Sequence, residues 1–324
     1  MKITCSACKK AFEIPDERIP IGKAIAFPCP ACENIIELDI THGLKGAGRS
    51  GLEENGHETG EALKKHILKN VGQLPPMPQT VLKAREIITD QAIAARVLKL
   101  ANSSYYGLSG KVASIQHASV VLGHKALAEL VTMGGTAAIL GTTLPGYGLD
   151  AGELWRHCLG VAFGARLIAN KKNPALSNDA FAAGLLHDAG KLILDPYILE
   201  RREAFQNFIA DSDDGFLAAE KAILAFDHCE IAAEVCKQWN IPKALTTAIR
   251  YHHYPSRSQN DPLAYIVHMA DGIAMMTGLG LGIDGMMYEF EEDAMAFLDL
   301  HEQDLDGIMA EVLESVQKIS NERQ

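Results

Sequence analysis

From Glu61 to its end, the chain consists mostly of segments in which apolar residues recur at the spacing of an α-helix. Ile93, Val97 and Leu100, for example, share one face of a predicted helix. The last segment is amphipathic and carries the apolar residues Ile308, Val312, Leu313, Val316 and Ile319. Hydrophobic residues make up 48% of the 324 residues, enough for a sizeable core, whereas aromatic residues make up only 6%. This part of the sequence therefore predicts an all-α fold rather than a β-sandwich.

Local signals indicate where some of these helices begin. The Ser-Asn-Asp sequence at 177–179 is typical of a cap before a helix over 180–187. Asp227 and Glu230 have the spacing of a capping box, which predicts a helix over 231–239.

The first 40 residues have a different character, with a C-x2-C pair near each end. Stretches of β-like alternation lie at 24–27 and 35–40. Four thiolates at these spacings favour a closed tetrahedral Zn²⁺ site, formed by Cys5, Cys8, Cys29 and Cys32. A segment this short cannot fold on its apolar core alone, so we expect zinc to supply much of its folding free energy.

This cysteine module resembles the small zinc ribbons at the N-terminus of many bacterial proteins. It contains five basic and six acidic residues, which favours a structural or protein-contact role over nucleic-acid binding. Residues 41–60 include six glycines and little that could be buried, which predicts a flexible linker. The predicted organisation is thus a β-type zinc ribbon over 1–40, a linker over 41–60 and a helical domain over 61–324.

Charge and hydropathy exclude several classes of protein. The formal net charge is −11, and no segment is strongly basic, which argues against nucleic acid as a partner. No apolar run reaches the length of a membrane span, and the polar N-terminus does not resemble a signal peptide. We therefore expect a cytoplasmic protein without membrane contact, whose seven cysteines serve as metal ligands or reduced core thiols.

The sequence GLLHDAGKL, residues 184–192, sets His187 and Asp188 directly behind an apolar run, with Lys191 one turn later. Similar polar groups occur in other apolar helices: Glu153 and His157, His228, His252 and His253, and Asp271. Each of these has a simple structural explanation by itself, such as a surface helix pair, an exposed first-turn residue or a contact with a helix end. Because a buried unpaired carboxylate is costly, their recurrence on successive helices favours a shared metal site.

The order H…HD…H…HH…D resembles the HD superfamily of metal-dependent phosphohydrolases. The segments LPPMPQTVL, AARVLKLANSSYYG and ASVVLGHKAL more narrowly resemble the HDOD domain of bacterial signalling proteins. This resemblance covers roughly Leu63 to Leu281 and implies an all-helical fold of the HD superfamily. HDOD domains often lack part of the metal set, whereas this chain also matches the ligand pattern of HD-GYP phosphodiesterases.

The resemblance implies two cations. One would be held by His157, His187, Asp188 and Asp271. The second would be held by His228, His252 and His253, with Asp188 bridging the two. Glu153 stands where some members of the superfamily have a further carboxylate ligand, and Lys191 would face a bridging hydroxide or phosphate.

These residue types suit metal-assisted hydrolysis. Two neighbouring cations clamp a phosphoryl group and acidify a bound water, and imidazoles with carboxylates favour Fe or Mn, with Zn as a further option. Asp188 and Lys191 are the candidate catalytic residues, although a surface salt bridge remains an alternative for Lys191. Cys158 and Cys229 follow histidines, but adjacent helix residues point about 100° apart, so we expect both thiols to face the core.

One departure bears on function: Tyr254 and Pro255 follow His253, but the acidic, glycine-rich continuation of the HD-GYP motif does not. The sequence thus favours a bacterial signal-transduction HDOD protein that retains a dinuclear metal site and binds signalling proteins. The alternative is an active phosphohydrolase acting on a phosphoester such as a nucleotide or cyclic nucleotide. His268 lies three residues before Asp271 and is interpreted as a structural histidine.

Overall fold

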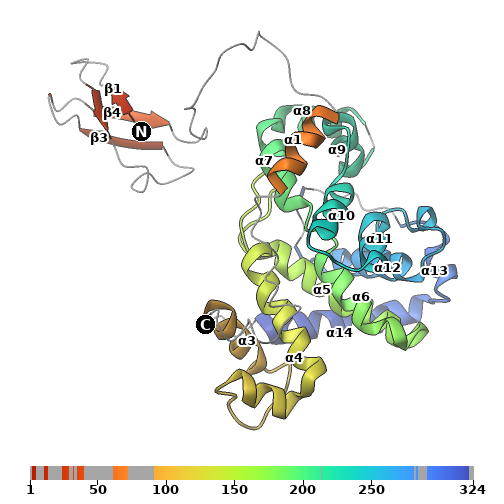
Figure 1. Cartoon of the computed structure of the whole chain (residues 1–324). Coiled ribbons are helices and arrows are strands. Elements are labelled where there is room, and N and C mark those ends of the chain that lie inside the picture. Colours follow the sequence, from red (N-terminus) through yellow and green to blue (C-terminus); the bar gives the residue numbers. More distant parts are fainter. Residues whose placement is uncertain are drawn as a thin grey trace. The chain divides into compact units, whose positions relative to one another are not determined.

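A computed structural model of the chain (Figure 1) describes residues 2–4, 11–13, 24–28, 32, 35–39, 61–71, 91–212, 214–280, 282–283 and 290–320. The chain divides into two compact units, Met1–His57 and Glu58–Gln324. The predicted linker over 41–60 lies outside the described residues.

The first unit contains two pairs of short antiparallel strands. Strands β1 (Lys2–Thr4) and β2 (Ala11–Glu13) pair with Ile3 opposite Phe12. Strands β3 (Ala24–Pro28) and β4 (Ile35–Asp39) pair with Ala26 opposite Glu37. The second pair coincides with the two stretches in which apolar and other residues alternate.

The second unit is helical, as the sequence predicts. Its first part contains α1 (Glu61–Val71), α3 (Gln91–Ala101), α4 (Ile115–Leu140), α5 (Glu153–Lys172) and α6 (Ser177–Leu186). Its middle part contains α7 (Lys191–Glu200), α8 (Arg202–Asp211), α9 (Phe216–Leu224), α10 (His228–Gln238) and α11 (Lys243–Tyr251). Its last part contains α12 (Pro262–Met276), α13 (Ala294–Phe297) and α14 (Glu302–Ser320).

Helices α5 and α12 form the centre of this unit. Thirteen of the 20 residues of α5 are buried, so this helix has neighbours on nearly every side, and it packs against α6, α12 and α14 (Figure 1). The contact with α6 is close because Gly184 has no side chain: a Cβ there would lie 2.9 Å from the backbone of Ala162. Helix α5 carries His157 and helix α12 carries Asp271, so the packing of these two helices positions two of the candidate metal ligands.

Two helix starts show how far local signals reach. Asp227 caps α10, and its Oδ1 accepts a hydrogen bond from the backbone N of Glu230 at 2.7 Å, as the capping pattern predicts. The Glu230 carboxylate, however, pairs with Lys64 and Arg250 instead of closing the box. The predicted cap at 177–179 was wrong: a 3-10 turn, Pro174–Leu176, leads into α6, and Ser177 already has helical dihedral angles.

The membrane prediction can be compared with the helices directly. None of the helices in the described part of the chain combines the length and apolar character that a membrane span needs.

Candidate metal centre

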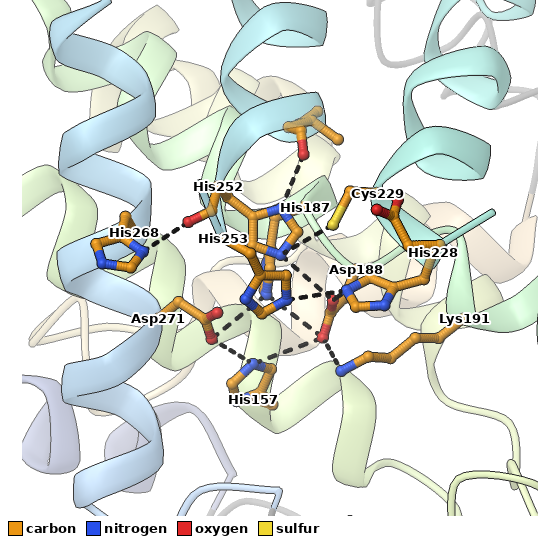
Figure 2. Close-up of polar contacts among 12 residues, drawn as sticks. His157, His187, Asp188, Lys191, His228, Cys229, His252, His253, His268 and Asp271 are labelled. Carbon is orange, nitrogen blue, oxygen red and sulfur yellow. Dashed lines mark hydrogen bonds and ion pairs between the residues drawn. The ribbon is translucent and has the colours of Figure 1, made fainter. Parts of the chain in front are cut away.

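Seven of the residues predicted as ligands meet in the interior of the helical unit (Figure 2). They come from five places in the chain, which are α5, the turn between α6 and α7, the start of α10, the end of α11 and the middle of α12. The residues are His157, His187, Asp188, His228, His252, His253 and Asp271. All are buried except His253, which is half-buried.

One side of this cluster, the first half, contains His157, His187 and Asp271. Asp271 Oδ1 lies 3.0 Å from His157 Nε2 and 3.6 Å from His187 Nε2. These three ligand atoms all lie within 4.8 Å of one another, a spacing at which one cation could contact all of them.

The other side, the second half, contains His228, His252 and His253. The Nε2 atoms of His228 and His253 lie 3.1 Å apart. A fourth donor joins them, because Cys229 Sγ lies 4.0 Å from His252 Nε2. The four donor atoms of this half also lie within 4.8 Å of one another.

Asp188 lies between the two halves and turns one carboxylate oxygen toward each. Its Oδ2 is 3.4 Å from His187 Nε2 and 3.7 Å from His157 Nε2. Its Oδ1 is 3.3 Å from His228 Nε2 and 3.9 Å from His252 Nε2. A carboxylate in this position can bridge two cations.

The backbone fixes the orientation of three imidazole rings. His157 Nδ1 lies 3.1 Å from the carbonyl oxygen of Leu279. His187 Nδ1 lies 2.8 Å from that of Gly184, and His252 Nδ1 lies 2.7 Å from that of Ile249. Because a carbonyl only accepts hydrogen bonds, each Nδ1–H must donate. In the neutral ring Nε2 then presents its lone pair to the cluster, which is how metal-ligating histidines are usually held.

A buried carboxylate performs the same role for His228. Glu220 Oε2 lies 2.8 Å from His228 Nδ1 and also accepts the backbone N–H of His228 at 2.8 Å. Tyr147 OH donates to the other oxygen of Glu220 at 2.7 Å. Sequence reasoning missed Glu220, and the available signal was an acidic residue in the apolar stretch FLAAEKAIL.

The inner atoms of the cluster lack hydrogen bonds. Nε2 of His157 and His187, Oδ1 of Asp188 and both carboxylate oxygens of Asp271 are buried with no hydrogen-bond partner among the described residues. A buried polar group without a partner costs about 1 to 3 kcal/mol, and several such lone pairs facing one another repel. A cation bound between them removes this cost, so the donor set fits a metal.

The electrostatics differ between members of the cluster. Burial by itself raises the pKa of Asp188, but the charges of His187 and Lys191 outweigh it and hold this pKa well below its usual range. Burial, with His187 beside it, lowers the pKa of His252 to about 3. Burial also disfavours the charged form of His187, but the neighbouring carboxylates outweigh it and hold the pKa of this imidazole well above its usual value. Because metal ligation requires ionised carboxylates and neutral imidazoles, a cation would take the place of a proton on His187.

Lys191 lies at the edge of the cluster. Its Nζ is 2.6 Å from Asp188 Oδ2 and 5.6 Å from the ring centre of Tyr147. The alternative of a surface salt bridge was wrong, because both partners of this ion pair are buried.

Glu153 is the one predicted ligand that the structure places elsewhere. Its carboxylate accepts a hydrogen bond from the backbone N of Asp150 at 2.8 Å and lies 3.6 Å from Arg156. In this structure Glu153 is not among the grouped donor atoms of the cluster. As the first residue of α5, Glu153 instead binds the backbone at the start of its own helix.

His268 and Cys229 complete the comparison with the sequence predictions. His268 is held by backbone on both ring nitrogens, with Nδ1 2.8 Å from the carbonyl of His252 and Nε2 accepting from the N of Glu291 at 3.0 Å. It is structural, as interpreted. Cys229 is buried as expected but lies against the imidazoles of the second half, and burial raises the pKa of its thiol to about 11.

Of the four cysteines predicted to bind zinc, Cys5, Cys8 and Cys29 lie outside the described residues. Cys32 is in a turn and is exposed. The geometry of the predicted zinc site is therefore not part of the described structure.

Residues 68–255 match the HDOD domain family, which is more than half of the chain. The chain belongs to the HDOD domain family. Residues 1–37 of this HDOD protein match a zinc-ribbon domain. Both assignments agree with the resemblances seen in the sequence.

Similar proteins are distant in sequence. An uncharacterised protein of Treponema pallidum (strain Nichols) is 23% identical over 203 residues, covering 58% of this chain and 39% of that protein. The chain thus matches only about two fifths of this curated relative's length.

Three solved structures show the same fold. An HDOD domain protein of unknown function from Geobacter sulfurreducens has a TM-score of 0.60 at 22% identity, covering 82% of this chain and 94% of that one. A candidate phosphohydrolase from Shewanella amazonensis SB2B has a TM-score of 0.59 at 22% identity, and the match covers 79% of this chain and 97% of that one. A candidate signal transduction protein from Marinobacter aquaeolei VT8 has a TM-score of 0.62 at 21% identity, with coverages of 80% and 64%.

Proposed function

We propose that this HDOD protein is a bacterial signal-transduction protein that holds two cations in its His/Asp cluster. The observation that carries the proposal is the set of buried ligand atoms of His157, His187, Asp188 and Asp271 without hydrogen bonds. Several buried atoms without hydrogen bonds at one place are costly, and a cation is the partner that suits converging lone pairs.

The ligands divide between the two positions as the resemblance implies. His157, His187 and Asp271 would hold one cation, and His228, His252 and His253 the other. Asp188 would bridge them, since its two oxygens face different halves of the cluster. Imidazole and carboxylate donors favour Fe or Mn, and also Zn, over Mg or Ca.

Signalling is favoured over turnover by the family and by the sequence beside the site. The segment after His253 lacks the acidic, glycine-rich continuation found in HD-GYP phosphodiesterases. The Marinobacter relative of similar fold is described as a candidate signal transduction protein. We further propose that other signalling proteins are the partners and that the four N-terminal cysteines hold Zn²⁺, in accord with the zinc-ribbon match.

A second function, phosphohydrolysis, has one specific observation in its favour. Lys191 Nζ is buried 2.6 Å from the oxygen of Asp188 that faces the first half. A fixed cation there could stabilise the negative charge of a phosphoester in its transition state, and bound metals would supply an activated water. The Shewanella relative of similar fold is described as a candidate phosphohydrolase.

Metal content and turnover test these proposals. We expect about two cations per chain beyond the ribbon zinc in the wild type and fewer than one in Asp188→Asn. Asp195→Asn is the matched control, because Asp195 is a buried aspartate on α7 whose Oδ1 accepts from the N of Gly146 and of Tyr147 away from the cluster. Wild-type metal content in Asp188→Asn would contradict the cation pair.

Turnover separates the two functions. The metal-loaded protein is assayed with Fe²⁺ or Mn²⁺ on a generic phosphodiester and on several cyclic dinucleotides. Full metal occupancy without turnover would support the signalling role. Turnover that is lost in Asp188→Asn and kept in Asp195→Asn would establish the hydrolase instead.

A further inference from the structure

The second half of the cluster contains one more donor than the family pattern implies. Cys229 is in the first turn of α10, directly after His228, and its side chain lies with the three imidazoles of this half (Figure 2). The four donor atoms, three nitrogens and one sulfur, lie within 4.8 Å of one another.

We propose that Cys229 is a further protein ligand of this position, beside His228, His252, His253 and the bridging Asp188, and that its sulfur makes the position selective for Zn²⁺. The inference rests on the proposed cation pair and deepens it, because it assigns different metals and different roles to the two halves. Apart from the bridging carboxylate, the first half offers nitrogen and oxygen donors, whereas the second offers nitrogen and sulfur.

Two of the donor spacings are close to those around a zinc ion. With Zn–N of about 2.05 Å and Zn–S of about 2.3 Å, ligands at the tetrahedral angle are separated by about 3.4 Å for two nitrogens and by about 3.6 Å for nitrogen and sulfur. The Nε2 atoms of His228 and His253 are 3.1 Å apart, and Cys229 Sγ is 4.0 Å from His252 Nε2. All four donor atoms lie within 4.8 Å of one another, so a single cation could contact them.

The bridging carboxylate supplies a further donor beside these four. Asp188 Oδ1 is buried, has no hydrogen-bond partner among the described residues, and lies 3.3 Å from His228 Nε2. This carboxylate oxygen lies beside the Nε2 atom of His228, which faces that of His253. A cation between these three atoms would give the oxygen a partner.

The sulfur donor decides both metal and role. A thiolate is a soft ligand that favours Zn²⁺ over Mn²⁺, and coordination releases the thiol proton to solvent. Three imidazoles, the thiolate and the bridging carboxylate would leave this cation no open position for water, and a closed site is typical of structural rather than catalytic zinc. Any water activated for hydrolysis would therefore bind at the first half, beside His157, His187 and Asp271.

Cobalt substitution tests this in the full chain. Thiolate bound to Co²⁺ gives a charge-transfer absorption in the near ultraviolet, to which the ribbon cysteines contribute equally in every variant. We expect the difference between wild type and Cys229→Ser to show the loss of one thiolate. Zn²⁺ affinity of this position should fall by more than about 100-fold, since even changes behind the ligands cost 10- to 100-fold.

Cys236→Ser is the matched control, because Cys236 is buried on the same helix α10 outside the cluster and should change neither the band nor the affinity. If Cys229→Ser does not fold, cadmium NMR of the wild type gives the same information. A site with both nitrogen and sulfur ligands should give a cadmium chemical shift between that of a site with only sulfur ligands and that of a site with only nitrogen and oxygen ligands. Such a resonance would confirm the mixed site.

Two negative results are distinguishable. If the helical unit binds cations but the cobalt band is unchanged in Cys229→Ser, or no mixed-site cadmium resonance is seen, then Cys229 is not a ligand. The proposed cation pair would not be affected by this result. A helical unit that binds no cation at all would overturn both proposals.

Discussion

The helical unit contains two buried polar clusters, and they are built differently. In one, Arg166 of α5 pairs with Glu129 of α4 and donates to the hydroxyl of Tyr105, while the rings of Phe163 and Phe181 lie near the guanidinium. A cation and an anion of the chain neutralise each other there. In the other, the His/Asp cluster, Lys191 pairs with one oxygen of Asp188, but its other oxygen and both oxygens of Asp271 have no hydrogen-bond partner among the described residues (Figure 2).

This contrast suits different roles. The Arg166 cluster connects the turn after α3 with α4, α5 and α6, and its charges are balanced by residues of the chain, as expected of a cluster that stabilises the fold. The His/Asp cluster has several buried atoms without hydrogen bonds, as expected of a cluster that binds a cation.

Removal of metal should have the largest effect on stability. A ligand at 1,000 times its dissociation constant stabilises the folded state by about 4 kcal/mol. Stripping the protein with a chelator should therefore lower its unfolding free energy by about that amount, and Mn²⁺ with Zn²⁺ should restore it. Both tryptophans, Trp155 and Trp239, lie in the helical unit, so their fluorescence in a urea titration follows this unit. An unchanged transition would remove the contrast between the two clusters.

Gly190→Ala should have the second-largest effect on the unfolding free energy. A Cβ at Gly190 would lie 2.0 Å from the backbone O of His228 and 2.8 Å from the N of Ala232, so α10 must move away from the turn that carries Asp188. We expect a loss of about 3 kcal/mol, the upper end of overpacking effects, together with loss of metal.

Gly307→Ala is the control for this substitution, because a Cβ at Gly307 meets nothing within 4 Å and a helical alanine is favourable. Urea unfolding and metal analysis of both variants test the prediction. A Gly190→Ala protein with wild-type metal content would show that the approach of α10 does not set the ligand geometry.

Arg166→Met should lower stability by about 2 kcal/mol, because it leaves the Glu129 carboxylate mostly buried without its counter-charge. Metal content should stay at the wild-type value, which separates this cluster from the other. Arg156→Met is the control on the same helix, since Arg156 is more exposed and its pair with Glu153 contributes little. Loss of metal in Arg166→Met would mean that the two clusters are coupled.

Among these changes, Glu220→Gln should have the smallest effect, and it should act on metal affinity. The amide can no longer stabilise the orientation of His228 as a carboxylate does, so affinity for the second cation should fall about 10-fold while unfolding of the metal-free protein changes little. Competition with a chromophoric chelator measures the affinity. Glu230→Gln, which loses only pairs with Lys64 and Arg250, should bind metal normally. Equal affinities of the two variants would contradict the role of Glu220.

The sequence predicted much of this site because its signals are local. His187 and Asp188 are adjacent, and so are His252 and His253, so a short stretch of apolar helix with polar residues at its end identifies them. Asp227 could be assigned as a cap for the same reason, since its partner is three residues away. The resemblance to the HD superfamily then supplied the connection between distant motifs.

The differences from prediction concern residues whose contacts depend on packing. Glu153 was predicted as a further carboxylate ligand, but at the start of α5 its carboxylate binds a backbone N–H. Glu220 and Cys229 were missed as members of the site because their partners, His228 and His252, lie on other helices or at their ends. An acidic residue among apolar ones and a thiol beside a predicted ligand are visible in the sequence, but the sequence does not show which atoms they meet.

The helical character of the second unit, the HDOD family and most of the candidate ligands could be predicted from the sequence, because periodicity and adjacent polar pairs are properties of short segments. The structure was needed to show which nitrogen of His187 faces inward, that Asp188 lies between two groups of donors, and that a thiol joins one of them. These features depend on distances between atoms on separate helices, and the packing of the helices sets those distances.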